Sequence, residues 1–187
     1  AAENFPECFR AKNNVGHVYV KLGKVAEAKE AFIAAKELKE NDVIKNNLGA
    51  LAVLEGDLTK AEELFSAAMG AGDVVNYNLG IIKIKQADYD AAVSYFGNKA
   101  SFNAALAQLL SGDTEKSLST LNQMGDVDCA KVYYLKAVGS ARSDREEGVL
   151  NNLRTAVSKK SELKDHAKKD LEFAKYAESE AFTSIVE

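Results

Sequence analysis

The stretch NNVGHVYVKLG at residues 13–23 decides the fold, because two further versions of it follow, NNLGALAVLEG at 46–56 and YNLGIIKIKQA at 77–87. In each version an asparagine stands two positions before a small residue, and a glycine or an alanine closes the segment. The return of one pattern at intervals of 33 and 31 residues indicates an array of repeated structural units.

A second half of the pattern follows each closing residue, as GKVAEAKEAFIAA from Gly23, GDLTKAEELFSAA from Gly56, ADYDAAVSYFGNK from Ala87 and GDTEKSLSTLNQM from Gly112. It contains a small residue followed four positions later by an aromatic residue or leucine, which places both on one face of a helix. These pairs are Ala28 and Phe32, Ala61 and Phe65, Ala92 and Phe96, and Ser117 and Leu121. Glycine suits the left-handed residue that ends a helix, and the aspartate after it can cap the next helix. Each unit is therefore predicted to be a helical hairpin.

The spacing of the hairpin turns is irregular at one place. Turns at Gly23, Gly56, Ala87, Gly112 and Asp144 are separated by 33, 31, 25 and 32 residues. The short third interval predicts that the second helix of the third unit and the loop after it are shortened, around residues 96–100.

These residues resemble the tetratricopeptide repeat family, in which a Leu-Gly step in the first helix precedes Gly, Ala, an aromatic residue and Ala at fixed places. The matching positions are Val15, Gly16, Tyr19, Gly23, Ala28, Phe32 and Ala35, then Leu48, Gly49, Gly56, Ala61, Phe65 and Ala68, then Leu79, Gly80, Ala92 and Phe96. The chain departs from the family at Lys12 and Lys45, where the family often has Trp, and no proline closes the units. The resemblance implies an all-α solenoid, because stacked hairpins bury the apolar faces that one hairpin leaves open.

The expected organisation is one superhelical domain over residues 1–187, within a longer chain. Its units are expected at about 9–42, 43–73, 74–97, 98–126 and 127–158, followed by a capping helix at about 161–179. Leu163, Ala167, Leu171, Ala174 and Ala177 give that last segment an amphipathic pattern with spacings of 4, 4, 3 and 3.

Composition excludes several functional classes. The chain has one proline, 47% apolar residues and a net charge of −4, which favours helices and argues against a nucleic-acid surface. No apolar run is long enough to cross a bilayer, so direct membrane insertion is not expected. Cys8 and Cys129 lack metal-ligand spacing, and His17 and His166 lie far apart, so we expect no catalytic residues, no metal site and no cofactor.

Four asparagines, Asn14, Asn47, Asn78 and Asn103, occupy the same place in their units. The resemblance implies that this place faces a concave groove, where an Asn can hold a peptide backbone through its carbonyl and amide groups together. The alternative is that these asparagines belong to the framework of the repeat. The predicted partner-binding residues are Asn13, Asn14, His17, Asn46, Asn47, Tyr77, Asn78, Ile81, Phe102 and Asn103.

The neighbouring groove positions are polar in the first unit, at Arg10 and Lys21, and apolar in later units, at Ala50, Val53 and Ile84. An extended peptide or an amphipathic helix with apolar side chains suits such a groove. We therefore expect a non-catalytic scaffold for a protein or peptide partner. The alternatives are a structural spacer whose groove is covered by the chain itself, and an enzyme whose titratable groups meet only on folding. A resemblance to tail regions of bacterial envelope proteins points to the periplasm or cell envelope.

Overall fold

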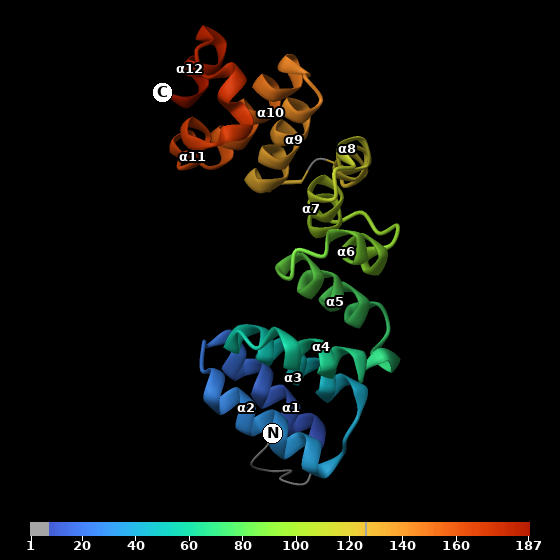
Figure 1. Cartoon of the computed structure of the whole chain (residues 1–187). Coiled ribbons are helices and arrows are strands. Elements are labelled where there is room, and N and C mark those ends of the chain that lie inside the picture. The colour runs from blue at the N-terminus through green and yellow to red at the C-terminus, as the bar shows by residue number, and fades with distance from the viewer. Residues whose placement is uncertain (1–7, 126) are drawn as a thin grey trace. The chain divides into compact units, whose positions relative to one another are not determined.

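The computed structural model describes residues 8–125 and 127–187, and in these two ranges the ordered elements are all helices (Figure 1). The elements are α1 Phe9–Lys21, α2 Val25–Leu38, α3 Asp42–Glu55, α4 Leu58–Ser66, η1 Met69–Ala71, α5 Asp73–Lys85, α6 Tyr89–Phe96, α7 Phe102–Leu110, α8 Thr114–Gln123, α9 Ala130–Arg142, α10 Glu146–Lys159, α11 Leu163–Lys169, η2 Leu171–Tyr176 and α12 Glu180–Val186. They form two compact units, one ending at Tyr95 and the other spanning Phe96–Glu187. The division into five repeats within one superhelical domain stays a prediction.

The turns between paired helices have the conformation that the sequence predicts. Gly56 ends α3 with φ +84°, and the side chain of Asp57 then accepts a hydrogen bond from the backbone N–H of Lys60 at 3.0 Å. Asp113 caps α8 in the same way, through the N–H of Lys116 at 3.1 Å. The predicted capping by aspartate is therefore confirmed at these turns. Ala87 adopts the left-handed conformation without being glycine, at φ +60°.

Close approach of the paired helices depends on two small residues in the first unit. A Cβ atom added to Gly49 would lie 2.7 Å from Cε1 of Phe65, and one added to Gly16 would overlap the ring of Phe32. Both rings are buried. The phenylalanine of the second helix thus fills the space that the glycine of the first helix leaves, as the repeat pattern predicts.

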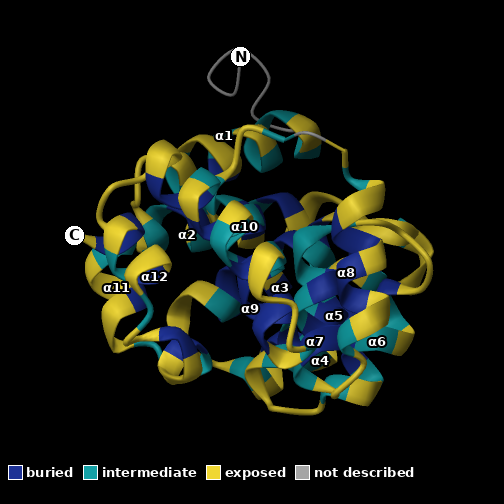
Figure 2. Ribbon diagram, turned by 90° about the horizontal axis from the view of Figure 1, so that it is seen from above, coloured by how far each residue is buried: buried dark blue, intermediate teal, exposed yellow. Residues whose placement is uncertain are grey.

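The second unit has one continuous core, to which α7, α8, α9 and α10 contribute together with the segment after them. Leu109, Leu121, Val132 and Leu153 are almost completely buried in it. Figure 2 shows how buried and exposed residues alternate along the helices, as expected of helices with one apolar face.

The capping helix expected over 161–179 is wrong as a single helix. Helix α11 stops at Lys169, and Asp170 has an extended backbone with ψ +117°. Its side chain accepts a hydrogen bond from the N–H of Glu172 at 3.1 Å and starts the 3-10 helix η2. In η2 the buried residues are Phe173 and Tyr176, three positions apart, whereas Leu171 is 87% exposed. The chain covers the last hairpin with three short helical segments, α11, η2 and α12.

Helix α6 is the shortest of the helices α1–α10, with 8 residues. The chain leaves it through Gly97, at φ +59°, and Ser101 then caps α7 by accepting from the N–H of Ala104 at 3.2 Å. The shortening predicted from the 25-residue interval is therefore found only in part. Compared with the preceding interval, α6 is one residue shorter than α4 and the loop at 97–101 is one residue shorter than the segment at 67–72. Most of the loss lies in α7, which has 9 residues where α5 has 13 and which the prediction did not name.

Candidate protein-interaction surface

Hydrogen bonds between asparagine side chains connect the first helices of neighbouring hairpins in the first unit. Nδ2 of Asn47 on α3 donates to Oδ1 of Asn13 on α1 at 2.7 Å. Nδ2 of Asn78 on α5 donates to Oδ1 of Asn46 on α3 at 2.8 Å. In both cases the asparagine that is two positions before the small residue donates to the asparagine three positions before it in the preceding hairpin. The repeated pattern thus reappears as repeated contacts.

His17 also takes part in the first of these contacts. Its Nε2 lies 3.1 Å from Nδ2 of Asn47, so the neutral imidazole can accept a hydrogen bond from that amide. The edge of its ring meets Phe32, with ring centroids 5.4 Å apart and an angle of 80° between the rings. Asn47 is only 7% exposed, whereas His17 remains exposed to solvent. The side chain of Asn47 is therefore buried between the hairpins, while the imidazole of His17 beside it is accessible to solvent.

We call this register of positions on α1, α3 and α5 the asparagine face, which contains exposed, half-buried and buried residues: Asn13, Asn14, His17, Asn46, Asn47, Ala50, Leu54, Tyr77, Asn78 and Ile81. Its centre is apolar. A small pocket of about 60 Å³ opens there between α1 and α3, with His17, Ala50 and Leu54 in its lining. Leu54 is 59% exposed at the rim of this pocket, next to exposed Ala50, which makes the rim a contact candidate.

Sequence reasoning missed part of this apolar surface and misplaced another part. Leu54, Val43 and Val74 are exposed, although none of them was expected in the groove. Val53, which was expected there, packs instead against the core around Phe65. Spacing alone could not separate the two, because Val53 and Leu54 stand three and four positions after Ala50 and both spacings lie near its helical face.

The remaining predicted site residues are distributed as follows. Asn14 is exposed and Ile81 is half-buried. Tyr77 is exposed in the second turn of α5. Phe102 and Asn103 belong to the second unit, where Phe102 packs against the core of that unit. The structure therefore joins Asn13, His17, Asn46, Asn47 and Asn78 through hydrogen bonds within the first unit.

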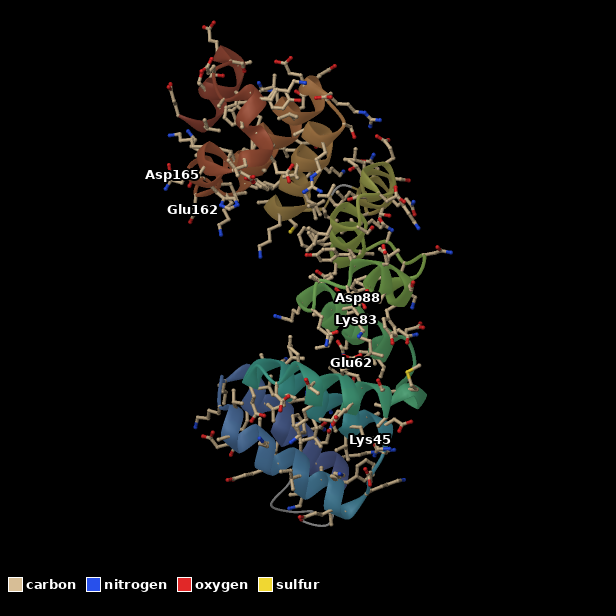
Figure 3. All side chains as sticks on the ribbon, viewed as in Figure 1. Lys45, Glu62, Lys83, Asp88, Glu162 and Asp165 are labelled. Atoms are coloured by element: carbon tan, nitrogen blue, oxygen red, sulfur yellow. The ribbon has the colours of Figure 1, made fainter. Side chains whose placement is uncertain are left out.

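Shifted pKa values accompany ion pairs that connect helices. Hydrogen bonds from Lys83 and then from Gln86 lower the pKa of Glu62, and the same contact raises the pKa of Lys83. Glu62 Oε1 lies 2.6 Å from Lys83 Nζ, and Figure 3 shows the two side chains meeting between α4 and α5. Burial, and then a hydrogen bond to Asp170, raise the pKa of Tyr134 far above its ordinary value. These groups hold neighbouring helices together.

The described residues contain no cluster of three or more His, Cys, Asp or Glu side chains that could hold a metal ion. Both cysteines are free thiols. Within ranges 8–125 and 127–187, no helix is both long enough and apolar enough to cross a bilayer.

Comparison with known proteins identifies the repeat. A family model for the tetratricopeptide repeat matches residues 9–42, which contain α1 and α2. No curated protein sequence is a significant match to this chain.

Solved structures share the fold at low sequence identity. The APC/C hetero-tetramer Cut9–Hcn1 superposes with a TM-score of 0.77 at 14% identity, over 100% of this chain and 38% of the other. YrrB, described as a TPR protein with an unusual peptide-binding site, gives 0.66 at 21% identity, over 90% of this chain and 96% of YrrB. PilW, a type IV pilus biogenesis factor, gives 0.72 at 17% identity, over 94% and 85%. The chain thus spans well under half of the Cut9 complex chain that it matches, and almost all of YrrB.

Proposed function

From the premise that residues 9–42 match a tetratricopeptide repeat model and that the chain shares the fold of a tetratricopeptide repeat protein, we propose that it is a non-catalytic scaffold for protein–protein interactions and binds a peptide or a partner helix on the asparagine face. The observation that carries this proposal is an exposed apolar strip beside the asparagine contacts, formed by Ala50 and Leu54 of α3. Both residues line a small pocket together with His17. An apolar side chain of a partner can enter this pocket and remove the leucine from water, which is worth about 1.5–3 kcal/mol for a fully buried leucine.

The asparagines contribute acceptors to this proposed site. Nδ2 of Asn47 already meets both Asn13 and His17, so a two-point hold on a peptide backbone by Asn47 requires one of these bonds to break. Nδ2 of Asn78 donates to Asn46 and has a second N–H group. Their carbonyl oxygens are the groups left to accept from a partner's N–H. In this proposal the amide nitrogens hold neighbouring hairpins together, and the side-chain oxygens accept hydrogen bonds from the partner.

Exposed residues beside the asparagine face change from polar on α1 to apolar on α3 and α5, which gives a bound partner an orientation. Arg10 and Lys21 lie exposed on α1, while Val43 and Leu54 on α3 and Val74 on α5 are exposed apolar residues. A partner that fits both parts has apolar residues at one end and polar or acidic residues at the other. The resemblance of the fold to a type IV pilus biogenesis factor is compatible with a location in the bacterial cell envelope, which we propose for the chain.

The second candidate is a structural spacer whose apolar strip is covered by other parts of its own polypeptide. It is favoured by the same observation, because large apolar surfaces are seldom left in water. The two functions differ in one property: a scaffold exchanges its partner, whereas a spacer does not bind a separate protein on this strip.

Affinity capture from the source cell with three forms of the chain separates these functions. The forms are the native chain, the Leu54→Ser variant and the control variant Leu22→Ser, which changes a leucine that is 63% exposed outside the asparagine face. We expect a protein that is retained by the native chain and by Leu22→Ser and lost with Leu54→Ser. Equal retention by all three forms contradicts the proposed surface, and capture of nothing by any form favours the spacer.

A further inference from the structure

The second unit contains a polar pocket that neither the repeat pattern nor the asparagine face explains. It has a volume of about 290 Å³ and lies between the stretch 97–99, α7 and α8. Gln108 of α7 lines it together with Lys116, Ser119, Thr120 and Gln123 of α8. Every side chain in the lining is an amide, a hydroxyl or a lysine, which is the composition of a site for a hydrophilic ligand.

A buried amide group in this lining has unused hydrogen-bonding capacity. Gln108 is only 3% exposed, and its Oε1 accepts a hydrogen bond from Oγ1 of Thr120 at 2.8 Å. Over the described parts of the chain, its Nε2 donates to no protein acceptor. This nitrogen is not a fully enclosed atom, so it keeps contact with solvent at the pocket wall and can donate to an acceptor on a ligand.

The charge of the pocket is positive. Lys99 and Lys116 line it, and no carboxylate does. The carboxylates nearest in sequence have other partners: Glu115 pairs with Arg145 at 2.8 Å, and Asp113 accepts from the backbone N–H of Lys116. Among the residues that the structure describes, none forms an ion pair with the ammonium group of Lys116. The ammonium group of Lys116, in a lining that contains no carboxylate, favours a negatively charged occupant.

The position of the pocket coincides with the irregular repeat. Its wall at 97–99 begins directly after α6, the shortest hairpin helix, where Gly97 turns the chain out of the helix. The first unit offers a direct comparison, because Lys60 occupies in α4 the place that Lys116 occupies in α8: the N–H of each is capped by the aspartate three residues before it. Lys60 does not line this pocket.

We propose that this pocket binds a small oxyanion-bearing molecule, either a phosphorylated compound or a polycarboxylate. Lys116 attracts the oxyanion, the Gln108 amide donates to one of its oxygens, and Ser119 and Gln123 at the rim hydrogen bond to the rest of the molecule. A volume of about 290 Å³ admits a molecule larger than phosphate itself. This site is separate from the asparagine face, so either proposal can fail without the other.

The test is a titration of the isotope-labelled chain followed by amide chemical shifts, with inorganic phosphate and citrate as the two anionic probes and glycerol as the neutral probe. Sodium chloride keeps the ionic strength constant, because screening changes the affinity of any anion for lysine. The variants are Lys116→Gln, Ser119→Asp and the matched control Lys60→Gln. All three substitutions are at exposed positions, and unchanged thermal unfolding of each variant verifies its fold.

We expect saturable shifts with at least one anion, concentrated at residues 97–99 and 116–123, and none with glycerol. Lys116→Gln should weaken that binding about tenfold, as for loss of a charge-assisted hydrogen bond, and Ser119→Asp should abolish it, whereas Lys60→Gln should leave it unchanged. A response to phosphate alone identifies a phosphoryl group, and a response to citrate alone identifies carboxylates. Shifts that spread over the surface lysines without saturation, equal binding by Lys116→Gln, or no shift with either anion would overturn the proposal.

Discussion

The side-chain amide of Asn47 donates to the side-chain oxygen of Asn13 across the two first helices α1 and α3, at 2.7 Å. The same amide nitrogen lies 3.1 Å from the ring of His17. One buried donor thus supports two residues of the preceding hairpin. Because the bond between Asn78 and Asn46 repeats this geometry, the asparagines fix the alignment of three successive hairpins before any partner binds.

Replacing Asn47 by Ala should lower the free energy of unfolding by about 1 kcal/mol, since it removes a largely buried hydrogen bond but leaves Asn13 and His17 able to reach water. Asn14→Ala is the matched control, because Asn14 has the same place in its unit and is exposed; it should change stability by less than about 0.5 kcal/mol. Urea unfolding of both variants measures the difference. If both substitutions lower the free energy of unfolding equally, the loss comes from replacing an asparagine at this place in the repeat and not from breaking the hydrogen bond to Asn13.

Gly49→Leu should destabilise the chain by about 1–3 kcal/mol or more, because even a Cβ atom at this place would lie 2.7 Å from the ring of Phe65. Ala50→Leu is the control: it adds the same side chain one position later, where α3 faces solvent, and should leave the melting temperature almost unchanged. Calorimetric melting curves of the two variants and of the native chain measure this difference in stability. An unaltered curve for Gly49→Leu would contradict the close contact between the helices.

Ala87→Gly should stabilise the chain by roughly 0.5–1 kcal/mol, since Ala87 ends its helix at φ +60°, a conformation that costs a residue with a Cβ atom more than it costs glycine. The reverse change at the equivalent turn, Gly56→Ala, should destabilise by a similar amount, because Gly56 has φ +84°. Both values come from denaturant unfolding. Loss of stability in Ala87→Gly would mean that the extra freedom of the unfolded chain outweighs the relief of strain.

Acid should weaken the contact between α4 and α5 through Glu62. Its pKa is lowered below the ordinary value of 4.5 by hydrogen bonds from Lys83 and Gln86, so the folded state binds a proton less readily than the unfolded state. The contribution of Glu62 is therefore complete above about pH 4.5 and is lost as the pH falls through the lowered pKa. Glu62→Gln should be less stable than the native chain at neutral pH, by up to about 1 kcal/mol, and this difference should shrink at about pH 3.

The measurement is the free energy of unfolding of both forms across this pH range. Glu30→Gln serves as the control, because Glu30 is an exposed glutamate of α2 without an ion pair among the described residues. It should follow the native chain at every pH. A constant difference between Glu62→Gln and the native chain down to about pH 3 would contradict the lowered pKa of Glu62.

The hairpins could be predicted from sequence because their signals are local. A turn residue, an aspartate cap and a small residue four positions before an aromatic one are each set by the geometry of a single hairpin, and Gly56, Asp57, Ala61 and Phe65 illustrate all of them. The partner of Asn47 could not be read in this way, because Asn13 is 34 residues distant and the bond depends on how two hairpins pack.

The segment after α10 shows a different limit. Spacings of four and three residues between Leu163, Ala167, Leu171 and Ala174 indicate one α-helix, yet Leu171 is largely exposed. Phe173 and Tyr176 are buried because they pack into the core that α9 and α10 form. Asp170 also contacts this hairpin, because its carboxylate accepts a hydrogen bond from Tyr134 of α9 at 2.7 Å. A contact with α9 therefore overrides the local period.

The division of the last segment into short helices has a consequence for the order of folding during synthesis. Helices α11 and α12 have seven residues each, too few to persist in water without support, so they can form only on the surface of α9 and α10. Until residues 163–186 have left the ribosome, the sides of α9 and α10 that α11, η2 and α12 cover lack these neighbours and present apolar surface to other nascent chains and to chaperones. Synthesis of residues 163–186 therefore ends the period in which the second unit is most exposed to aggregation.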